Sequence, residues 1–348
     1  LCALYGSGWT DQTAYTQIWQ WWAYADDCGV AHMNVVHVTN PSSVPFGGMS
    51  ANTVYVFQSG IYYLPNDVST KPCVAFVSSG ETTISTYDNY SLNVNDGFNI
   101  IDNIDINGKN IASYGIILRS KRDTLHNMDI YNNVELGIRV EDSSENLLKN
   151  INIFDNDRGI YWNPYAYIID DVNVHNNLRD WILFEYPEYN IINNSKIYNN
   201  GGAWINIYWG RRNSINNTLI FNNNGDYWLL IQGPSLNLIN NSMIFSNSSH
   251  GVRLIESDVL FARSYVYNNG HLNGWLWIIV DSSSNLEYFD DNYVFDNRYW
   301  PFGIDGSVYG WSANSSFNWW NGVFYDDGGS FNPIDFRTSR DYLVNPVN

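Results

Sequence analysis

Short apolar runs alternate with polar breaks along most of this chain. Between about residues 97 and 300, runs rich in Ile, Val and aromatic residues are separated by Asn, Asp, Gly or Ser. No repeat unit there keeps a helical period over ten consecutive residues. Period-two alternation bounded by turn-forming residues predicts short β-strands.

The strand pattern recurs with a period of about 23 residues. Each copy reads as Asn or a polar substitute, two variable residues, Ile or Val, a residue that is usually aromatic, and then an Asn-rich pair. A second apolar stretch follows about ten residues after each start, as in Gly137-Ile-Arg-Val. Nine copies start at Asn103, Asn127, Asn150, Asp171, Asn194, Asn217, Asn241, Arg263 and Asp291, at spacings of 24, 23, 21, 23, 23, 24, 22 and 28 residues.

These units predict an all-β fold, a right-handed parallel β-helix. A unit of about 23 residues cannot bury its own apolar side, so the copies must stack, with three strands per coil and coils about 4.8 Å apart. We expect the β-helix to span residues 53–300. A Trp-rich N-terminal cap of residues 1–52, with a short helix within Thr13–Asp27, and a loop-rich C-terminal cap of residues 301–348 would close its ends. The Trp cluster would alternatively be a docking surface.

In eight of the nine copies an Asn lies three residues after the Ile or Val. Asn tolerates the left-handed backbone of a tight corner, and stacked amides can hydrogen-bond from coil to coil. We therefore expect a structural Asn ladder. Its predicted members are Asn133, Asn156, Asn177, Asn200, Asn223, Asn247, Asn269 and Asn297.

The repeat resembles a known superfamily. The pattern Asn-x-Ile-x-Asn-x-x-Ile-x-Asn-Asn…Gly-Ile is similar to the repeats of NosD-like and pectate-lyase-like β-helix proteins, of the surface-protein kind, over about residues 97–300. Asn318-Trp-Trp-Asn-Gly and Asn345-Pro346 are similar to their closing segment. The resemblance implies the fold and leaves the function open, because lyases, hydrolases, adhesins and surface layers share it.

Composition narrows the class of protein. The 348 residues carry 17 Lys and Arg against 35 Asp and Glu, a net charge of −18, which disfavours nucleic-acid binding. The longest apolar run, Trp275–Val280, is too short for a membrane span. The start at Leu1 suggests an exported chain without its leader, and hence an extracellular or cell-surface location. Cys2, Cys28 and Cys73 are then disulfide candidates, with three pairings open and three reduced thiols as the alternative.

No catalytic set is apparent. The characteristic Asp and His segments of β-helix hydrolases and lyases do not occur together, and we treat acidic doublets such as Asp170-Asp171 as solvated turns. The six His have no metal-ligand spacing, so no metal or other cofactor is expected, apart from weakly supported Ca²⁺ binding at acidic turns. Alternation along the second apolar stretch points a row of charged and aromatic residues outward, as a solvated face or as a surface that binds sugar or another subunit. This candidate row comprises Arg139, Glu141, Tyr161, Glu185, Tyr208 and Arg253.

Six Asn-x-Ser/Thr sequons are glycosylation candidates. About 50 Asn residues would produce about that number by chance, and three of the six fall at the repeat spacing. Occupancy would need export in a glycosylating host. The candidates are Asn89, Asn193, Asn216, Asn240, Asn247 and Asn314.

Two functions fit these observations. The regular spacing and the absent catalytic sets favour a non-enzymatic extracellular structural protein, a cell-surface, sheath or filament subunit that assembles with itself through its ends and aromatic faces. The alternative is a carbohydrate-active β-helix protein, either a polysaccharide lyase or hydrolase or a polysaccharide-binding module, whose partner would be a polysaccharide.

Overall fold

The structure is a computed structural model. It describes residues 34–267, apart from gaps at 41–45, 47, 66, 87, 90, 163–164, 180–181, 203–204, 211, 225–226, 234–235, 249 and 257, and further strands between 276 and 326. The chain divides into two compact units, Leu1–Asn177 and Leu178–Asn348. The described residues of both form β-strands and no α-helix.

The strands of the first unit lie on three faces. Three long strands each run through the first and second faces: β11 (Thr124–Tyr131), β13 (Leu147–Phe154) and β15 (Ile168–His175). The first face also has β1 (Asn34–Val38), β2 (Thr53–Phe57), β5 (Val74–Ser78) and β8 (Ile100–Asp102), and the second has β3 (Gly60–Leu64), β6 (Thr82–Thr86) and β9 (Asp105–Asn107). The third face has β4 (Val68–Ser69), β7 (Leu92–Val94), β10 (Tyr114–Leu118), β12 (Leu136–Val140) and β14 (Arg158–Trp162).

The second unit repeats the three faces with shorter strands. The first face has β17 (Ile191–Asn193), β20 (Ser214–Asn216), β23 (Leu236–Asn240), β26 (Asp258–Ala262), β29 (Asn285–Asp290) and β32 (Ser307–Val308). The second has β18 (Lys196–Tyr198), β21 (Leu219–Phe221), β24 (Met243–Phe245), β27 (Tyr265–Tyr267), β30 (Tyr293–Phe295) and β33 (Trp319–Trp320). The third has β16 (Ile182–Glu185), β19 (Ile205–Tyr208), β22 (Tyr227–Gln232), β25 (His250–Ile255), β28 (Leu276–Val280), β31 (Trp300–Ile304) and β34 (Phe324–Asp326).

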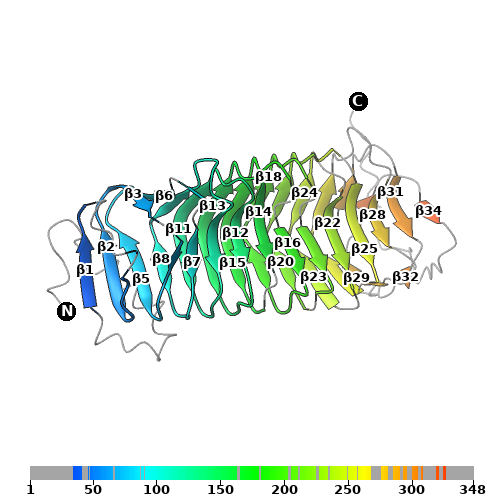
Figure 1. The fold of residues 1–348 in the computed structure, drawn as a ribbon. Helices are drawn as coiled ribbons and strands as arrows, with labels where there is room; N and C mark the ends of the chain where they lie inside the picture. The colour runs from blue at the N-terminus through cyan, green and yellow to red at the C-terminus, as the bar shows by residue number, and fades with distance from the viewer. Residues whose placement is uncertain are drawn as a thin grey trace. The chain divides into compact units, whose positions relative to one another are not determined.

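Every face is built by parallel pairing between one turn and the next. On the third face Ile116 pairs with Ile138, and Ile138 pairs with Ile160, each one turn further along the chain. In the second unit Ile197 pairs with Ile220, and Ile220 with Ile244. Figure 1 shows the successive turns within each unit. The predicted all-β parallel solenoid of about 23 residues per turn is confirmed.

The parallel stack is longer at both ends than the sequence predicted. Strand β1 lies within the predicted N-terminal cap, yet it pairs with β2 in parallel. In the predicted C-terminal cap, β34 pairs with β31 in parallel. These strands lack the Asn-rich repeat, so periodicity could not find them. The predicted helix within Thr13–Asp27 and its Trp cluster lie outside the described residues.

Apolar side chains from all three faces fill the interior of the turns. Ile138, Ile151 and Ile153 are fully buried in the first unit, as are Ile205 and Leu229 in the second. Near the start of the chain the interior is aromatic, and the ring of Phe57 meets those of Tyr62 and Phe76 edge to face at 5.0 and 5.6 Å. This interior is the apolar side that a single repeat could not bury.

Buried asparagine amides connect the turns at the corner after the second face. In the first unit Asn133 Nδ2 donates to Asn156 Oδ1 at 2.8 Å, and Asn156 Nδ2 to Asn177 Oδ1 at 3.2 Å. Each acceptor oxygen also receives the backbone N–H of the preceding asparagine, as in Asn133 N to Asn156 Oδ1 at 3.0 Å. The second unit has the same arrangement from Asn200 to Asn223 and on to Asn247, at 3.2 and 3.0 Å. Asn269 and Asn297 lie outside the described residues.

The left-handed backbone at this corner falls one residue earlier than the sequence analysis placed it. Positive φ values occur at Asn132, Asp155 and Asn176, at 58°, 53° and 55°, and not at the ladder residues that follow them. The left-handed residue turns the chain, and the next side chain then points inward to meet the adjacent turn. The preceding position therefore uses the tolerance of Asn for this conformation, and the ladder position uses its amide.

A second ladder follows the third face, and in one turn a carboxyl group replaces the amide. Asn99 donates to Asp123 Oδ1 from its backbone N and from Nδ2, at 2.9 and 3.1 Å, and Ser120 Oγ lies 2.5 Å from Asp123 Oδ2. Burial raises the pKa of the Asp123 carboxyl to about 7, against the lowering effect of these hydrogen bonds. One turn later the same pair of positions holds Ser143 and Asn146, where Asn146 Nδ2 donates to Ser143 Oγ at 2.7 Å.

We predict that Ile197→Asp unfolds the second unit. Ile197 is fully buried, so the substitution places an unpaired carboxylate in the apolar interior, at a cost of roughly 3–5 kcal/mol. Denaturant unfolding measures the loss. Lys196→Asp, at the exposed neighbouring position of the same strand, is the control and should change the free energy of unfolding by less than about 1 kcal/mol. Equal effects of the two would contradict the inward placement of Ile197.

We predict that Asp123→Asn stabilises the protein at neutral and higher pH. The pKa of Asp123 is raised from 3.8 to about 7 in the folded state. The protonated carboxyl group therefore contributes up to roughly 4 kcal/mol to the free energy of unfolding below pH 4, and this contribution is lost as the pH rises through 7. The Asn variant reproduces the Ser143–Asn146 pair of the next turn and has no such loss. Its advantage in melting temperature should therefore be largest near pH 8 and vanish near pH 4. An advantage that does not depend on pH would contradict this assignment.

Candidate functional site

Charged and aromatic side chains lie on the outer side of the third face, opposite the buried row. Ile138 and Val140 are buried in β12, and Arg139 between them points outward. Arg139 pairs with Ile117 of the preceding turn and Tyr161 of the following one. Three members of the predicted row, Arg139, Glu141 and Tyr161, therefore lie on this face of the first unit.

The remaining predicted members lie in the second unit. Glu185 and Tyr208 pair directly, at the ends of β16 and β19. The backbone of Arg253 pairs with that of Leu230, which lies two residues before Gln232, the partner of Tyr208. Arg139, Tyr161 and Arg253 occupy one position of the strand repeat, and Glu141, Glu185 and Tyr208 occupy the position two residues later, as the alternation in the sequence predicts.

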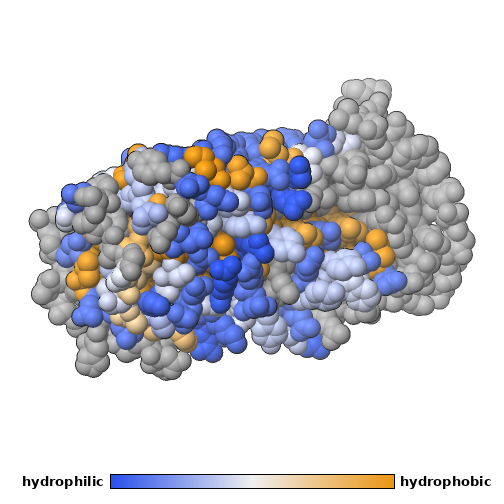
Figure 2. All heavy atoms as spheres, in the orientation of Figure 1, coloured by the Kyte–Doolittle hydropathy of each residue, from blue (hydrophilic) through white to orange (hydrophobic). Residues whose placement is uncertain are grey.

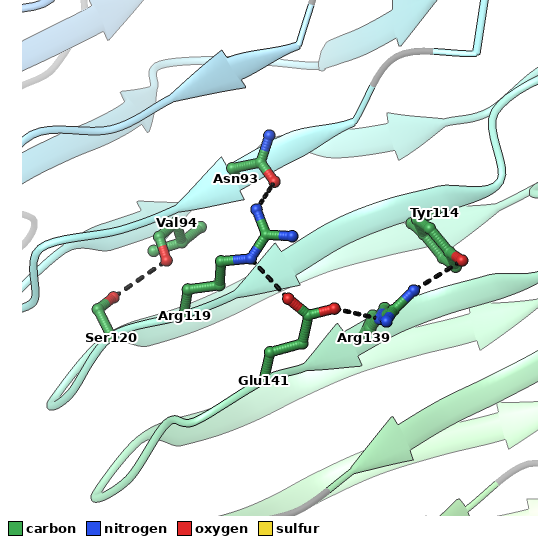
Figure 3. A network of polar contacts seen from close by, with 7 residues as sticks. All are labelled: Asn93, Val94, Tyr114, Arg119, Ser120, Arg139 and Glu141. Atoms are coloured by element: carbon green, nitrogen blue, oxygen red, sulfur yellow. Dashed lines mark hydrogen bonds and ion pairs between the residues drawn. The ribbon is translucent and has the colours of Figure 1, made fainter.

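Glu141 holds two arginines in the first unit, as Figure 3 shows. Its Oε2 accepts from Arg119 Nε at 2.6 Å, and its Oε1 lies 2.5 Å from Arg139 Nε. Arg119 also donates through NH1 to Asn93 Oδ1 at 2.9 Å, and Arg139 through NH1 to the Tyr114 hydroxyl at 2.7 Å. We call Asn93, Tyr114, Arg119, Arg139 and Glu141 the arginine site.

The sequence analysis identified Arg139 and Glu141 but missed the other three. Arg119 follows β10 in the same way that Glu141 follows β12, because the backbone N–H of Glu141 donates to Leu118 O one turn earlier. The signal was present in the repeat, since Arg119 and Glu141 are 22 residues apart. The second apolar stretch was not aligned as far back as Tyr114–Leu118, so this turn was overlooked.

The arginine site is half-exposed and is held together by polar contacts. The side chains of Arg119, Arg139 and Glu141 are 43%, 34% and 28% exposed. The Arg139 guanidinium also lies over the Tyr114 ring, 4.8 Å from its centroid, a cation–π contact. Two guanidinium groups share the Glu141 carboxylate, and a second carboxylate, that of Glu135, lies at the Tyr114 hydroxyl. Planar, fixed guanidinium groups suit the paired oxygens of a carboxylate.

The Tyr114 hydroxyl of this site is not prepared for proton transfer at neutral pH. Burial, followed by the hydrogen bond to the Glu135 carboxylate, raises the pKa of Tyr114 further above 10, and the Arg139 charge only partly opposes this. A general base requires a pKa near the working pH.

Stacked aromatic rings on the second face serve the fold. Tyr131, Phe154 and His175 stack nearly parallel in the first unit, with centroids 5.1 and 5.2 Å apart. In the second unit Tyr198, Phe221, Phe245 and Tyr267 do the same at 5.0 to 5.1 Å. Each inner ring has both faces covered by its neighbours, so these stacks do not present flat faces to a ligand. Burial lowers the pKa of His175, which favours a neutral imidazole in the stack.

The glycosylation candidates have different surroundings. Asn89 is exposed, whereas Asn193, Asn216 and Asn240 are half-buried next to hydrogen-bonded corners. Asn247 is fully buried, and its amide donates to Ile220 O and accepts from Asn223. A glycan on Asn247 is incompatible with this ladder, so that candidate is wrong. Asn314 lies outside the described residues.

Cys73 is disulfide-bonded, so the three cysteines are not all reduced. Cys2 and Cys28 lie outside the described residues. Among the residues that the structure describes, no group of three His, Cys, Asp or Glu side chains is arranged to hold a metal ion. In that same part of the chain, no helix has the length and apolarity needed to cross a membrane. Asp327, at one of the acidic turns considered for Ca²⁺, lies outside the described residues.

Comparison with known proteins agrees with the fold. Residues 158–318 match the family model described as a right handed beta helix region. This match and the parallel turns described above fit right-handed parallel β-helix repeat proteins, as the sequence pattern suggested. No curated protein sequence matches the chain significantly.

Several solved structures share this fold at low sequence identity. The A-module of the Azotobacter vinelandii mannuronan C-5 epimerase AlgE6 is similar with a TM-score of 0.59 and 11% identity, over 82% of this chain and 90% of that one. The alginate lyase from Paenibacillus sp. str. FPU-7 has a TM-score of 0.55 and 13% identity, over 69% and 98%. The catalytic domain of a GH87 alpha-1,3-glucanase in complex with tetrasaccharides has 0.52 and 11%, over 81% and 64%. Identities this low show the fold alone.

Proposed function

We propose that this protein binds an acidic polysaccharide, and that the arginine site recognises the carboxylate groups of its sugars. The observation that carries the proposal is the pair Arg119 and Arg139, held in place by one shared carboxylate and left half-exposed. The protein is strongly acidic, so fixed positive groups make an anion more favourable at this place than on the rest of the surface.

Glu141 accepts a hydrogen bond from Arg119 Nε and lies 2.5 Å from Arg139 Nε, and Asn93 and Tyr114 each accept from one NH1 group. The NH2 groups are the donors of the two guanidinium forks that none of these contacts uses. Because the side chains are already ordered, binding a carboxylate loses less conformational entropy than it would at two mobile arginines.

The comparisons support the carbohydrate class. Structures of the same fold include a mannuronan epimerase, an alginate lyase and a glucanase with bound tetrasaccharides. The first two are named for acidic polysaccharides. Binding rather than catalysis is proposed here because the contacts of the arginine site hold both guanidinium groups in place.

An extracellular location is part of this proposal. Its support is the disulfide at Cys73, which is stable in oxidising compartments, together with a polysaccharide ligand that would be met outside the cell. The self-assembling structural subunit favoured by the sequence analysis has less support. Its evidence is still the regularity of the turns, and the chain ends through which it would assemble lie outside the described residues.

We predict that Arg119→Ala and Arg139→Ala each weaken binding of a mannuronate hexamer at least tenfold, as measured by isothermal titration calorimetry. A hydrogen bond to a charged group contributes about 1.5–3 kcal/mol, which corresponds to a factor of ten or more. Affinity of the unsubstituted protein should also fall as salt is added, because the half-exposed pair is screened.

The matched control is Arg122→Ala. Arg122 also forms an ion pair with a glutamate, Glu145, at 2.8 Å, and its side chain is 49% exposed, but it lies outside the arginine site. Its loss should leave affinity for the hexamer unchanged. Equal weakening by all three variants would indicate a general charge effect, and no binding to the unsubstituted protein would refute the proposal.

A further inference from the structure

The corner that follows the third face carries aromatic residues in an unfavourable backbone conformation. In the second unit Tyr186 and Trp209 occupy this corner in successive turns, with φ of 54° and 57°. The left-handed region is accessible to Gly and tolerated by Asn and Asp, but bulky side chains are rare there because they crowd the backbone. Equivalent corners in other turns hold Asp142, Gly233 and Glu256.

Backbone hydrogen bonds show that these corners are stacked. Tyr186 N donates to Tyr208 O at 2.7 Å, and Trp209 N to Gln232 O at 2.5 Å. The following corner is Gly233, where an added Cβ would lie 2.6 Å from Trp209 Cα. That corner therefore presents no side chain beside Trp209. The fold would accept Asn or Gly in place of Tyr186 and Trp209, so their rings are not required to make the turn.

The rings form an open cluster. Tyr186 is 60% exposed and Trp209 38% exposed. The Tyr208 ring lies between them, edge to face with Tyr186 at 6.4 Å and with Trp209 at 6.0 Å between centroids. Unlike the stacks on the second face, these rings do not cover one another face to face. The exposed fractions of Tyr186 and Trp209 therefore leave part of each ring accessible at the surface.

Polar groups flank the aromatic cluster. Glu185 is half-buried on the strand position that pairs with Tyr208. Three residues after each aromatic corner lie Tyr189 and Arg212, where Arg212 NH1 donates to the Tyr189 hydroxyl at 2.7 Å. Figure 2 shows one face of the molecule, on which hydrophilic residues are more extensive than hydrophobic ones among the residues in colour.

We infer that the cluster of Tyr186, Tyr208 and Trp209 is a second carbohydrate site, which binds neutral pyranose rings by stacking. A pyranose has an apolar C–H face and a rim of hydroxyl groups, which matches open aromatic rings beside a carboxylate and a guanidinium. Left-handed backbone at Tyr186 and Trp209, where simpler residues would fit, supports a functional role, although Phe98, Tyr189 and Arg212 also have positive φ. This site depends on stacking, so it is independent of the carboxylate recognition proposed for the arginine site.

The test replaces both corner aromatics by the residue that this conformation prefers. Cellohexaose is the probe, titrated calorimetrically against the protein. The double variant Tyr186→Asn/Trp209→Asn should bind it at least tenfold more weakly than the unsubstituted protein does. Its melting temperature should stay level or rise, because Asn relieves the backbone strain. A purely structural role of the rings would instead lower the melting temperature.

Two controls distinguish stacking at this site from a general effect of substitution and from binding at the arginine site. Glu256→Asn changes the same corner of a later turn and should leave cellohexaose binding unaffected. The double variant should bind the mannuronate hexamer as the unsubstituted protein does, whereas Arg119→Ala should keep its affinity for cellohexaose.

Four outcomes would overturn the inference. They are a failure of the unsubstituted protein to bind cellohexaose, an unchanged affinity in the double variant, and a loss of binding in that variant that accompanies a loss of stability. The fourth is self-association of the unsubstituted protein that only the double variant abolishes, without saccharide binding, because it would make the cluster a protein interface.

Discussion

The structure depends on satisfying backbone and side-chain polar groups at corners that are buried between successive turns. A parallel solenoid pairs its strand amides with the adjacent turn, but each corner leaves N–H groups without a strand partner. Here asparagine side chains accept them: Asn156 Oδ1 receives both the backbone N–H and the side-chain amide of Asn133. An unpaired buried polar group costs free energy comparable to a lost hydrogen bond. The Asn repeat is therefore a requirement of the corners and not a composition bias.

The same requirement explains where variation is tolerated. Ladder positions are fully buried and must both donate and accept, so only a few residues fit them. Asp123 breaks this rule, and burial raises the pKa of its carboxyl group so that the protonated form can fill the place of an amide. Outward positions have no such constraint. The arginine site and the aromatic corner both use them, which is why binding groups can be added to this fold without disturbing its turns.

Sequence reasoning predicted the fold because periodicity reports burial directly. It located the inward positions such as Ile138, and it identified Arg139 and Glu141 as outward neighbours. It failed where the repeat fades, at β1 and at the strands after residue 300. It also placed the left-handed residue one position late, because two adjacent asparagines look alike in sequence although one turns the chain and the other bonds to the next turn. Contacts such as Arg119 with Glu141 needed the exact register between turns.

The two proposed sites differ in the physics of their ligands, and the acidic character of the protein explains why. A net charge of −18 repels polyanions at long range, so an acidic polysaccharide can be held only where fixed positive groups outweigh that field locally. The arginine site brings two guanidinium groups together on this surface. Stacking on Tyr186 and Trp209 carries no such electrostatic opposition. Added salt should therefore weaken the interaction that depends on the arginines, because it screens them, and leave ring stacking largely unchanged.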